Sequence, residues 1–219
     1  MKVLNLYACL GGNRYLWDKS AKEAGIYLEV TAVELDPELA RMYQERFPND
    51  KVIVADAHQY LLDHYKEFDF IWSSPPCPTH SKMVKATKHD INVYPDMGLY
   101  QEIILLQHKF KGKWVVENVQ SYYDPLIPPQ KSTRHYYWSN FTITNCECVP
   151  KIKNMSKATR EEMAEYLGFN YPGANFYIKK NHDPAQVLRN CIHPIEGKHI
   201  FDLALGIYKS NNTKQLTIL

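Results

Sequence analysis

The feature that most constrains the fold is an apolar run that stops abruptly at two prolines and a cysteine. Residues 68–72 are apolar apart from one aspartate, and two serines, two prolines and Cys77 follow them. Proline cannot donate to a β-ladder, so the run predicts a buried strand that leaves its sheet at this point. In a parallel α/β sheet ligands bind at the carboxyl ends of the strands, which places Cys77 at the mouth of a site. A small buried cysteine after a turn is the other interpretation, and this stretch alone leaves both open.

Strand-like and helix-like segments alternate along the first two thirds of the chain. This spacing predicts an α/β fold with a doubly wound, mostly parallel sheet of the Rossmann-like type. Strands are expected at residues 2–7, 27–33, 52–54, 68–72, 114–116 and 136–138. Helices are expected at residues 13–24, 37–46, around 60–65 and 99–110.

The last third of the chain has a different pattern. Residues 141–155 show no clear periodicity. A capping box, Thr159 followed by Glu162, predicts a helix that Gly168 ends. A final helix is expected over residues 194–208, with an apolar stripe that includes Ile200 and Leu203.

Composition narrows the setting of the protein. The 219 residues include five cysteines without framework spacing, which favours a reducing compartment, and the amino terminus enters a strand pattern directly, without a signal peptide. No apolar run approaches the length of a membrane span, so we expect a cytoplasmic protein with no membrane partner. The net charge is only +2. Binding to nucleic acid therefore requires a local cluster of cations, such as the histidines and lysines of the loop at residues 79–90.

Polar features stand at the ends of the first three predicted strands. A glycine turn, Ala8-Cys9-Leu10-Gly11-Gly12, follows Tyr7 and allows backbone to approach a ligand at a helix amino terminus. Glu34 lies 22 residues after Gly12, close to the spacing at which an acid meets ribose hydroxyls. Asp56 is suited to accept from an exocyclic amine. Taken alone, each acid is also explained by solvation or helix capping at a strand end. The ordered set of features predicts a pocket for an adenosine-bearing cofactor.

These positions resemble motifs of the cytosine-C5 DNA methyltransferases, which use S-adenosylmethionine. The turn after Tyr7 resembles the family's F-x-G-x-G-G, and Glu34 and Asp56 resemble its second-strand and third-strand acids. Residues 75–78 resemble the P-P-C-Q nucleophile motif, and residues 117–119 match its E-N-V. This last pair is the most specific part of the resemblance.

Further matches extend the resemblance over nearly the whole chain, in the family's usual order. Residues 130–134 resemble Q-x-R-x-R and keep only its second arginine, Arg134. Residues 162–169 resemble E-x-A-x-x-x-G-F, and residues 190–194 resemble the closing N-A-V-P. The implied organisation is a cofactor-binding and catalytic domain at residues 1–140, a target-recognition segment at 141–158, and carboxy-terminal helices at 159–219 that complete the catalytic domain.

The resemblance implies transfer of a methyl group from S-adenosylmethionine to cytosine in double-stranded DNA. Cys77 would add to C6 of a flipped-out base, Glu117 would hold the N3 and N4 edge, and Arg134 would bind O2. For nucleic-acid contact it implies Ser81, Lys82, Lys85 and Lys88. For cofactor binding it implies Tyr7, Ala8, Cys9, Leu10, Gly11, Gly12, Glu34, Leu35, Asp56, Ala57, Pro76, Leu99 and Asn190.

The sequence departs from the family at four places. Cys9 replaces a turn glycine, so its backbone must avoid positive φ or accept strain. Pro78 replaces a glutamine, and Ser132 replaces an arginine. The recognition segment is far shorter than the family's usual domain-sized region. A loop this short contacts few base edges, so we expect short or relaxed sequence specificity, or a partner that supplies it.

Two other functions and one metal site are weighed against this hypothesis. An RNA cytosine methyltransferase would use the same flipped-base chemistry, and a non-catalytic nucleic-acid-binding relative would keep the fold alone. The presence of Cys77, Glu117 and Arg134 argues against the second. Cys146, Cys148, Cys191 and His193 are conceivable zinc ligands, but their C-x-C spacing is tighter than in common zinc modules, so we expect no metal.

Overall fold

The strands form one mixed sheet in the computed structural model, which describes residues 1–82, 94–169, 183 and 185–208. Its order is β3-β2-β1-β4-β5-β7-β6. The first five strands run parallel, β7 is antiparallel to β5, and β6 pairs antiparallel with β7. The strands are β1 (Lys2–Leu6), β2 (Glu29–Glu34), β3 (Lys51–Val54), β4 (Phe70–Ser73), β5 (Lys113–Val119), β6 (Gln130–Ser132) and β7 (His135–Ser139). The predicted doubly wound, mostly parallel α/β sheet is confirmed.

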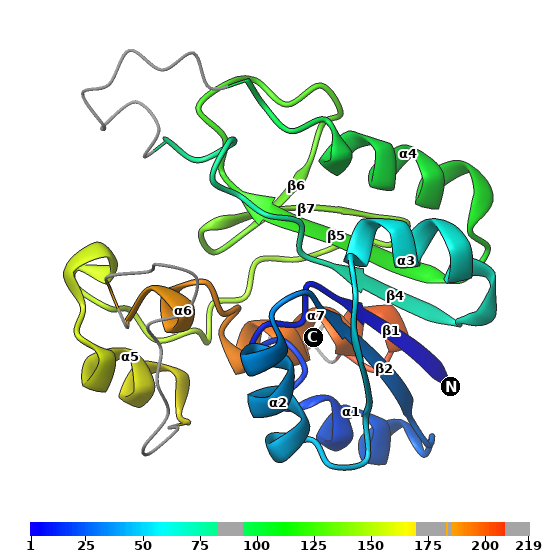
Figure 1. The fold of residues 1–219 in the computed structure, drawn as a ribbon, viewed down its shortest axis with the longest axis horizontal. Helices are drawn as coiled ribbons and strands as arrows, with labels where there is room; N and C mark the ends of the chain where they lie inside the picture. Colours follow the sequence, from blue (N-terminus) through cyan, green and yellow to red (C-terminus); the bar gives the residue numbers. More distant parts are fainter. Residues whose placement is uncertain (83–93, 170–182, 184, 209–219) are drawn as a thin grey trace, which may run out of the picture.

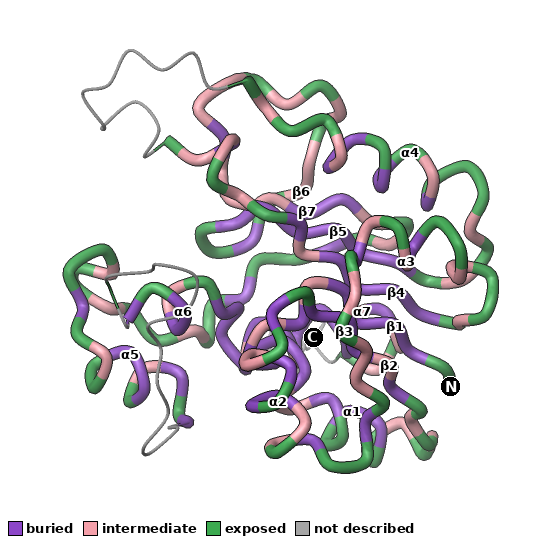
Figure 2. Tube along the Cα trace, in the orientation of Figure 1, coloured by how far each residue is buried: buried purple, intermediate pink, exposed green. Residues whose placement is uncertain are grey.

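Helices cover both faces of this sheet (Figure 1). On one face α3 (Ala57–His64) and α4 (Gly98–Lys109) pack against Leu4, Ile71 and Val116. On the other, α1 (Trp17–Ala24) and α7 (Pro194–Leu205) pack against the opposite side chains of the same strands, and α2 (Pro37–Arg46) lies beside them. The central strands are consequently the most continuously buried part of the chain (Figure 2).

Two short helices pack together at one side of the molecule, apart from the sheet (Figure 1). They are α5 (Arg160–Leu167) and α6 (Ala185–Arg189). Two 3-10 turns, η1 (Tyr65–Glu67) and η3 (Met155–Lys157), lie elsewhere in the described chain. The apolar contact of α5 and α6 includes Met163, Leu167 and Leu188, and it reaches Leu10 in the turn after β1.

Local sequence explains where most helices begin and end. Pro37 occupies the first turn of α2, and the Asp36 carboxylate caps its backbone amides. The capping box of Thr159 and Glu162 is present at α5, and Gly168 ends that helix with φ +71°. Both features confirm the prediction from sequence.

Tertiary contacts override local sequence in three places. The first helix begins at Trp17 rather than residue 13, because the Asn13 amide donates to Asn5 and Arg14 is paired with Asp50. The last helix ends at Leu205, since Gly206 adopts φ +71°. The short β6 and α6 were not expected from sequence. None of the described helices is long and apolar enough to cross a membrane.

Candidate active site

The Pro-Pro-Cys segment is held against the neighbouring strand. β4 ends at Ser73, and β5 continues beside it to Glu117 and Asn118. The Asn118 side-chain amide donates to the Pro75 carbonyl over 3.0 Å. After the prolines, the Cys77 carbonyl accepts from the backbone amides of residues 80 and 81, which closes a turn. The sheet therefore carries the thiol at the carboxyl end of β4, as the sequence predicts.

The pKa of Cys77 is under two opposing charged influences. Burial raises the pKa of the thiol, the Glu117 carboxylate raises it further, and the Arg134 guanidinium lowers it. The two charged influences are the residues that the sequence assigns to catalysis with Cys77. The thiol of the free protein is therefore protonated near neutral pH, and its activation requires a change in this environment.

Glu117 is almost completely enclosed. Burial raises the pKa of its carboxyl group. The charges of His135 and Arg134 lower this pKa, and so does a hydrogen bond with Ser74. The imidazole of His135 lies on the same side of the sheet, with Nε2 3.8 Å from Glu117 Oε1. A carboxyl group whose pKa is raised by burial takes up a proton more readily than a solvated one, and in that form it donates a hydrogen bond.

Arg134 belongs to the tight turn between β6 and β7. Thr133, before it, has φ +48°, an unusual conformation for a β-branched residue. Its amide donates to Asn145 and its hydroxyl to Glu196, and these bonds hold the turn. The exposed Arg134 side chain donates to the Arg189 carbonyl over 3.0 Å, so the segment before α7 restrains the guanidinium.

Ser132, which stands where the family pattern has an arginine, has a structural contact instead. Its buried hydroxyl accepts from the Cys146 amide over 3.1 Å. This bond ties β6 to the short segment 141–158. Burial also raises the pKa of the Cys146 thiol to about 11, which disfavours the thiolate form that a metal would bind. Within the described ranges, no group of three or more His, Cys, Asp or Glu side chains could hold a metal ion.

The turn after β1 is strained and closely packed. Cys9 adopts φ +47°, so the chain accepts the strain that its missing glycine would have avoided, and Tyr7 adopts φ +56°. The Cys9 amide donates to Glu34 Oε2, and the other Glu34 oxygen accepts from the Asp36 amide. A Cβ at Gly12 would lie 2.4 Å from the Ile192 carbonyl oxygen. The turn therefore joins the end of β2 to the segment before α7.

Apolar and acidic groups lie together at the ends of β2 and β3. Val54 is paired with Glu34 in the sheet, and Leu35 is the residue directly after Glu34. Both apolar side chains are more than half exposed, at 56% for Leu35 and 54% for Val54. Asp56 caps α3 through one carboxylate oxygen. The remaining residues implied for the cofactor differ in exposure: Ala8, Leu10, Gly11, Ala57 and Leu99 are buried, whereas Pro76 and Asn190 are exposed.

The start of the loop predicted to bind nucleic acid, residues 79–90, is anchored rather than free. His80 is buried, and its Nδ1 lies 2.6 Å from the Tyr123 hydroxyl. Ser81 forms an isolated β-bridge with Ser121, and Lys82 is exposed. The later part of the loop, with Lys85 and Lys88, lies outside the described residues. His80 was not expected from sequence to have this anchoring contact.

One residue of this region was not expected from sequence at all. Glu102 on α4 is fully buried, and it accepts from the hydroxyls of Tyr7 over 2.6 Å and Ser73 over 2.5 Å. Its Oε1 also lies 3.0 Å from His58 Nδ1, and this contact is the main cause of the raised pKa of His58. Glu102 thus connects the ends of β1 and β4 with the start of α3. The available signal was an acid at helical spacing among the apolar residues of α4.

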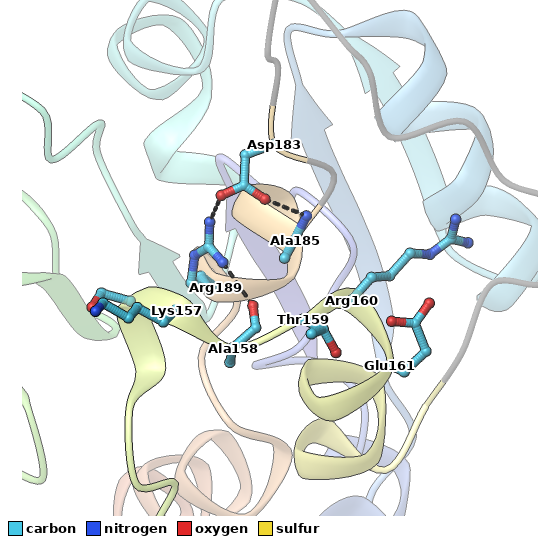
Figure 3. Close-up of a pocket in the computed structure, with 9 residues that line it drawn as sticks. Lys157, Ala158, Thr159, Arg160, Glu161, Asp183, Ala185 and Arg189 are labelled. Atoms are coloured by element: carbon cyan, nitrogen blue, oxygen red, sulfur yellow. Dashed lines mark hydrogen bonds and ion pairs between the residues drawn. The ribbon is translucent and has the colours of Figure 1, made fainter.

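A cavity of about 500 Å³ lies between the start of α5 and α6 (Figure 3). The Arg189 guanidinium pairs with Asp183 there and donates to the Ala158 carbonyl. Its lining includes none of the residues that the sequence assigns to the site. Its connection with the catalytic region runs through the Arg189 backbone, which accepts from Arg134.

The mostly parallel α/β sheet is a Rossmann-like fold, and it is shared with solved methyltransferase structures. The structure is similar to that of the methyltransferase EhMeth of Entamoeba histolytica, with a TM-score of 0.56 and 12% identity over 96% of this chain and 99% of that one. It is also similar to a mutant DNMT2 of Spodoptera frugiperda, with a TM-score of 0.53 and 14% identity over 94% and 99% of the respective chains. No curated protein sequence matches the chain significantly.

The family follows from the sequence match. The model of the C-5 cytosine-specific DNA methylases matches residues 1–126, more than half of the chain. The chain belongs to this family, as the motif resemblance indicated.

Proposed function

We propose that this protein transfers a methyl group from S-adenosylmethionine to C5 of cytosine in double-stranded DNA. The observation that carries the proposal is the position of Cys77 just after β4 and of Glu117 near the end of the adjoining β5, with Arg134 close enough to lower the pKa of the thiol. A thiol, a protonatable carboxyl and a guanidinium are the three groups that activation of cytosine requires.

Each residue has a distinct part in the proposed reaction. The Cys77 thiolate forms a bond to C6 of the cytosine, while the Glu117 carboxyl shares its proton with N3 and Arg134 binds the O2 on which charge develops. The electron pair displaced to C5 then takes the methyl group that S-adenosylmethionine supplies. Loss of the C5 proton restores the double bond, and cleavage of the sulfur–C6 bond releases Cys77. The base must leave the duplex for this attack, because C5 and C6 are stacked inside it.

The resting state of the site fits this order of events. Burial raises the pKa of the Cys77 thiol, which keeps the thiol protonated, and burial also raises the pKa of Glu117, which favours its uptake of a proton. Entry of the base beside Arg134 would displace water and strengthen the electrostatic interaction of the guanidinium with both the substrate and the Cys77 sulfur. The free enzyme thus avoids unproductive thiolate chemistry until a substrate is bound.

The residues at the other strand ends fit S-adenosylmethionine. The exposed Leu35 and Val54 side chains offer an apolar surface to an adenine ring, and Asp56 has a carboxylate oxygen available for its exocyclic amine. Glu34 is fixed by two backbone amides, and a carboxylate retains acceptor capacity beyond these bonds for ribose hydroxyls. The methionine part would then lie by the turn at residues 8–12.

The substrate preference is also part of the proposal. Segment 141–158 is fully described and has only the 3-10 turn η3 as regular structure. So short a surface supports recognition of a few base edges, or recognition through a specificity partner. The exposed Lys82 and the lysines that follow it in sequence are proposed to bind the DNA backbone.

One assay tests this proposal. The protein is incubated with labelled S-adenosylmethionine and either random-sequence duplex DNA or tRNA, and the nucleosides are analysed. We expect 5-methylcytosine in DNA, spread over sites that share a short or relaxed motif. Product only in tRNA would assign an RNA methyltransferase, and product in neither would refute the catalytic proposal. Cys77→Ser should abolish turnover while cofactor binding, measured by calorimetry, is retained.

A further inference from the structure

A buried group of polar side chains lies behind Glu117, between the sheet and α7. It consists of His135 and Tyr137 on β7, Glu196 on α7, and Thr133 in the turn before β7, and we call it the Glu196 cluster. His135, Tyr137 and Glu196 are 5%, 0% and 1% exposed. The proposed reaction uses none of them directly. Buried charges of this kind need an explanation, because burial without a partner is costly.

Strand register brings the cluster to Glu117. Glu117 pairs with Tyr137 across the antiparallel β5–β7 ladder. His135 is two residues from Tyr137, so all three side chains point to the same face of the sheet. This is the face that α7 covers, and α7 contributes Glu196.

Glu196 accepts two hydrogen bonds and lies at ion-pair distance from the histidine. Glu196 Oε1 accepts from the Thr133 hydroxyl over 2.6 Å and the Tyr137 hydroxyl over 2.8 Å. The other oxygen, Oε2, lies 3.6 Å from His135 Nδ1. His135 and the two hydroxyls lower the pKa of Glu196 against the effect of burial, so the carboxylate form is favoured.

The opposite edge of the imidazole faces the catalytic acid. His135 Nε2 lies 3.8 Å from Glu117 Oε1, an ion-pair distance that a shift of less than about 1 Å would turn into a hydrogen bond. The ring therefore lies between two carboxyl groups, at ion-pair distance from each, and within the described part of the chain its buried Nδ1 has no hydrogen-bond partner. Proteins commonly orient a functional group through such a second partner.

We propose that His135, anchored by Glu196, is a positioning residue that orients the Glu117 carboxyl and sets whether it meets cytosine as an acid or a carboxylate. This inference rests on the proposed function of Glu117. His135 does not touch the base, and it acts only through Glu117. Thr133 and Tyr137 act one step further away by fixing Glu196.

Other charged groups around the pair must be considered in any pH dependence. Facing Glu117 are Arg134 from the β6–β7 turn and Cys77 from the loop after β4, besides His135 and Glu196. Facing Glu196 are Tyr137 from β7, Cys146 from the segment after β7, Tyr166 from α5 and His193 before α7. Among these groups, His135 is the largest influence that lowers the pKa of Glu117 against the effect of burial.

The test compares His135→Leu with His135→Gln in the full chain. We expect His135→Leu to lower kcat about tenfold or more with KM for DNA nearly unchanged, the scale seen when an orienting partner is lost. His135→Gln restores a side-chain donor and should recover part of this loss. A matched control is His199→Leu, since His199 on α7 is 6% exposed and, among the described residues, forms its hydrogen bonds with Thr144 and its ring contact with Tyr208.

A second readout does not depend on turnover. Carboxyl ¹³C NMR of glutamate-labelled protein, assigned with Glu117→Gln, follows the titration of Glu117. In His135→Leu it should move to higher pH by roughly one unit or more, because an opposing influence is removed. If wild type methylates nothing but this titration still moves, the proposed function fails and the positioning of Glu117 survives. If His135→Leu does not fold, Glu196→Gln replaces it, and an equal loss of kcat is expected.

Three outcomes would overturn the inference. The first is wild-type kcat together with an unchanged Glu117 titration in His135→Leu, or wild-type kcat in Glu196→Gln where that variant replaces it. The second is a fall in kcat with the same pH profile and titration as wild type, which would indicate a merely structural role. The third is an equal effect of His199→Leu on the titration.

Discussion

Replacing Gly12 by alanine should damage both the stability of the protein and its cofactor site. Gly12 has no strained φ, so the effect is steric alone. The new Cβ would lie 2.4 Å from the Ile192 carbonyl oxygen and 2.9 Å from the Cys191 Cβ. Real Cβ contacts rarely fall below 3.0 Å, so the turn and the Ile192 backbone must separate by about 0.6 Å or more.

The magnitude follows from the cost of overpacking. Forcing a methyl group into a closed contact costs about 1–3 kcal/mol, which in a domain of this size lowers Tm by roughly 2–10 °C. The displaced segments are those proposed to hold S-adenosylmethionine. Its Kd should therefore rise at least about tenfold, equivalent to about 1.4 kcal/mol.

A matched variant separates the two effects. Gly112 lies just before β5, at the amino-terminal ends of the strands and away from the site at their carboxyl ends. A Cβ added there would lie 2.3 Å from the Asp69 carbonyl oxygen. Gly112→Ala should lower Tm similarly in calorimetry, yet leave the Kd for S-adenosylmethionine unchanged in titration. If Gly12→Ala binds the cofactor as well as Gly112→Ala does, the proposed placement of the cofactor beside this turn is wrong.

Two further predictions concern the site and the fold. Alkylation of Cys77 by iodoacetamide, followed by peptide mass spectrometry, should increase with pH through a midpoint above the ordinary pKa of ~8.5 of a thiol. Glu117→Gln should lower this midpoint and Arg134→Ala should raise it. A common midpoint in all three proteins would contradict the opposing influences of Glu117 and Arg134 on the thiol. Asp50→Asn should lower the free energy of unfolding, measured in urea, by about 3–5 kcal/mol, because it leaves the buried Arg14 without the carboxylate that accepts from it over 3.0 Å. The control is Glu38→Gln, which removes an exposed pair with Arg41 and should change the free energy of unfolding little.

The parts of the fold that the sequence predicts are those decided by local chemistry. The start of α2 at Pro37 and the ends of α5 at Thr159 and Gly168 depend on a few neighbouring residues. The strand ends that place Cys77 and Glu117 were predicted because long apolar runs stop there. Periodicity and capping are short-range signals, so a single sequence reveals them.

The parts that the sequence leaves open depend on distant contacts. The polar strand β6 gains its place from pairing with β7, and no apolar alternation marks it. Glu102 and Glu196 lie at apolar positions of their helices, and only the fold shows that hydroxyl groups from other elements meet them. An acid on an apolar helical face is thus a detectable anomaly, but its partner is not readable from the sequence.

Backbone strain identifies the same region as the side-chain chemistry. Among the described residues, positive φ outside glycine occurs at Tyr7, Cys9 and Thr133. The first two belong to the turn proposed for the cofactor, and Thr133 precedes the proposed O2 ligand, Arg134. Each is held by hydrogen bonds to a buried acid: Tyr7 to Glu102, Cys9 to Glu34 and Thr133 to Glu196. Strain persists only where surrounding contacts overdetermine a conformation. Glu34 belongs to the motifs, whereas Glu102 and Glu196 lie outside them. Together the three buried acids supply the restraint that glycines would have made unnecessary.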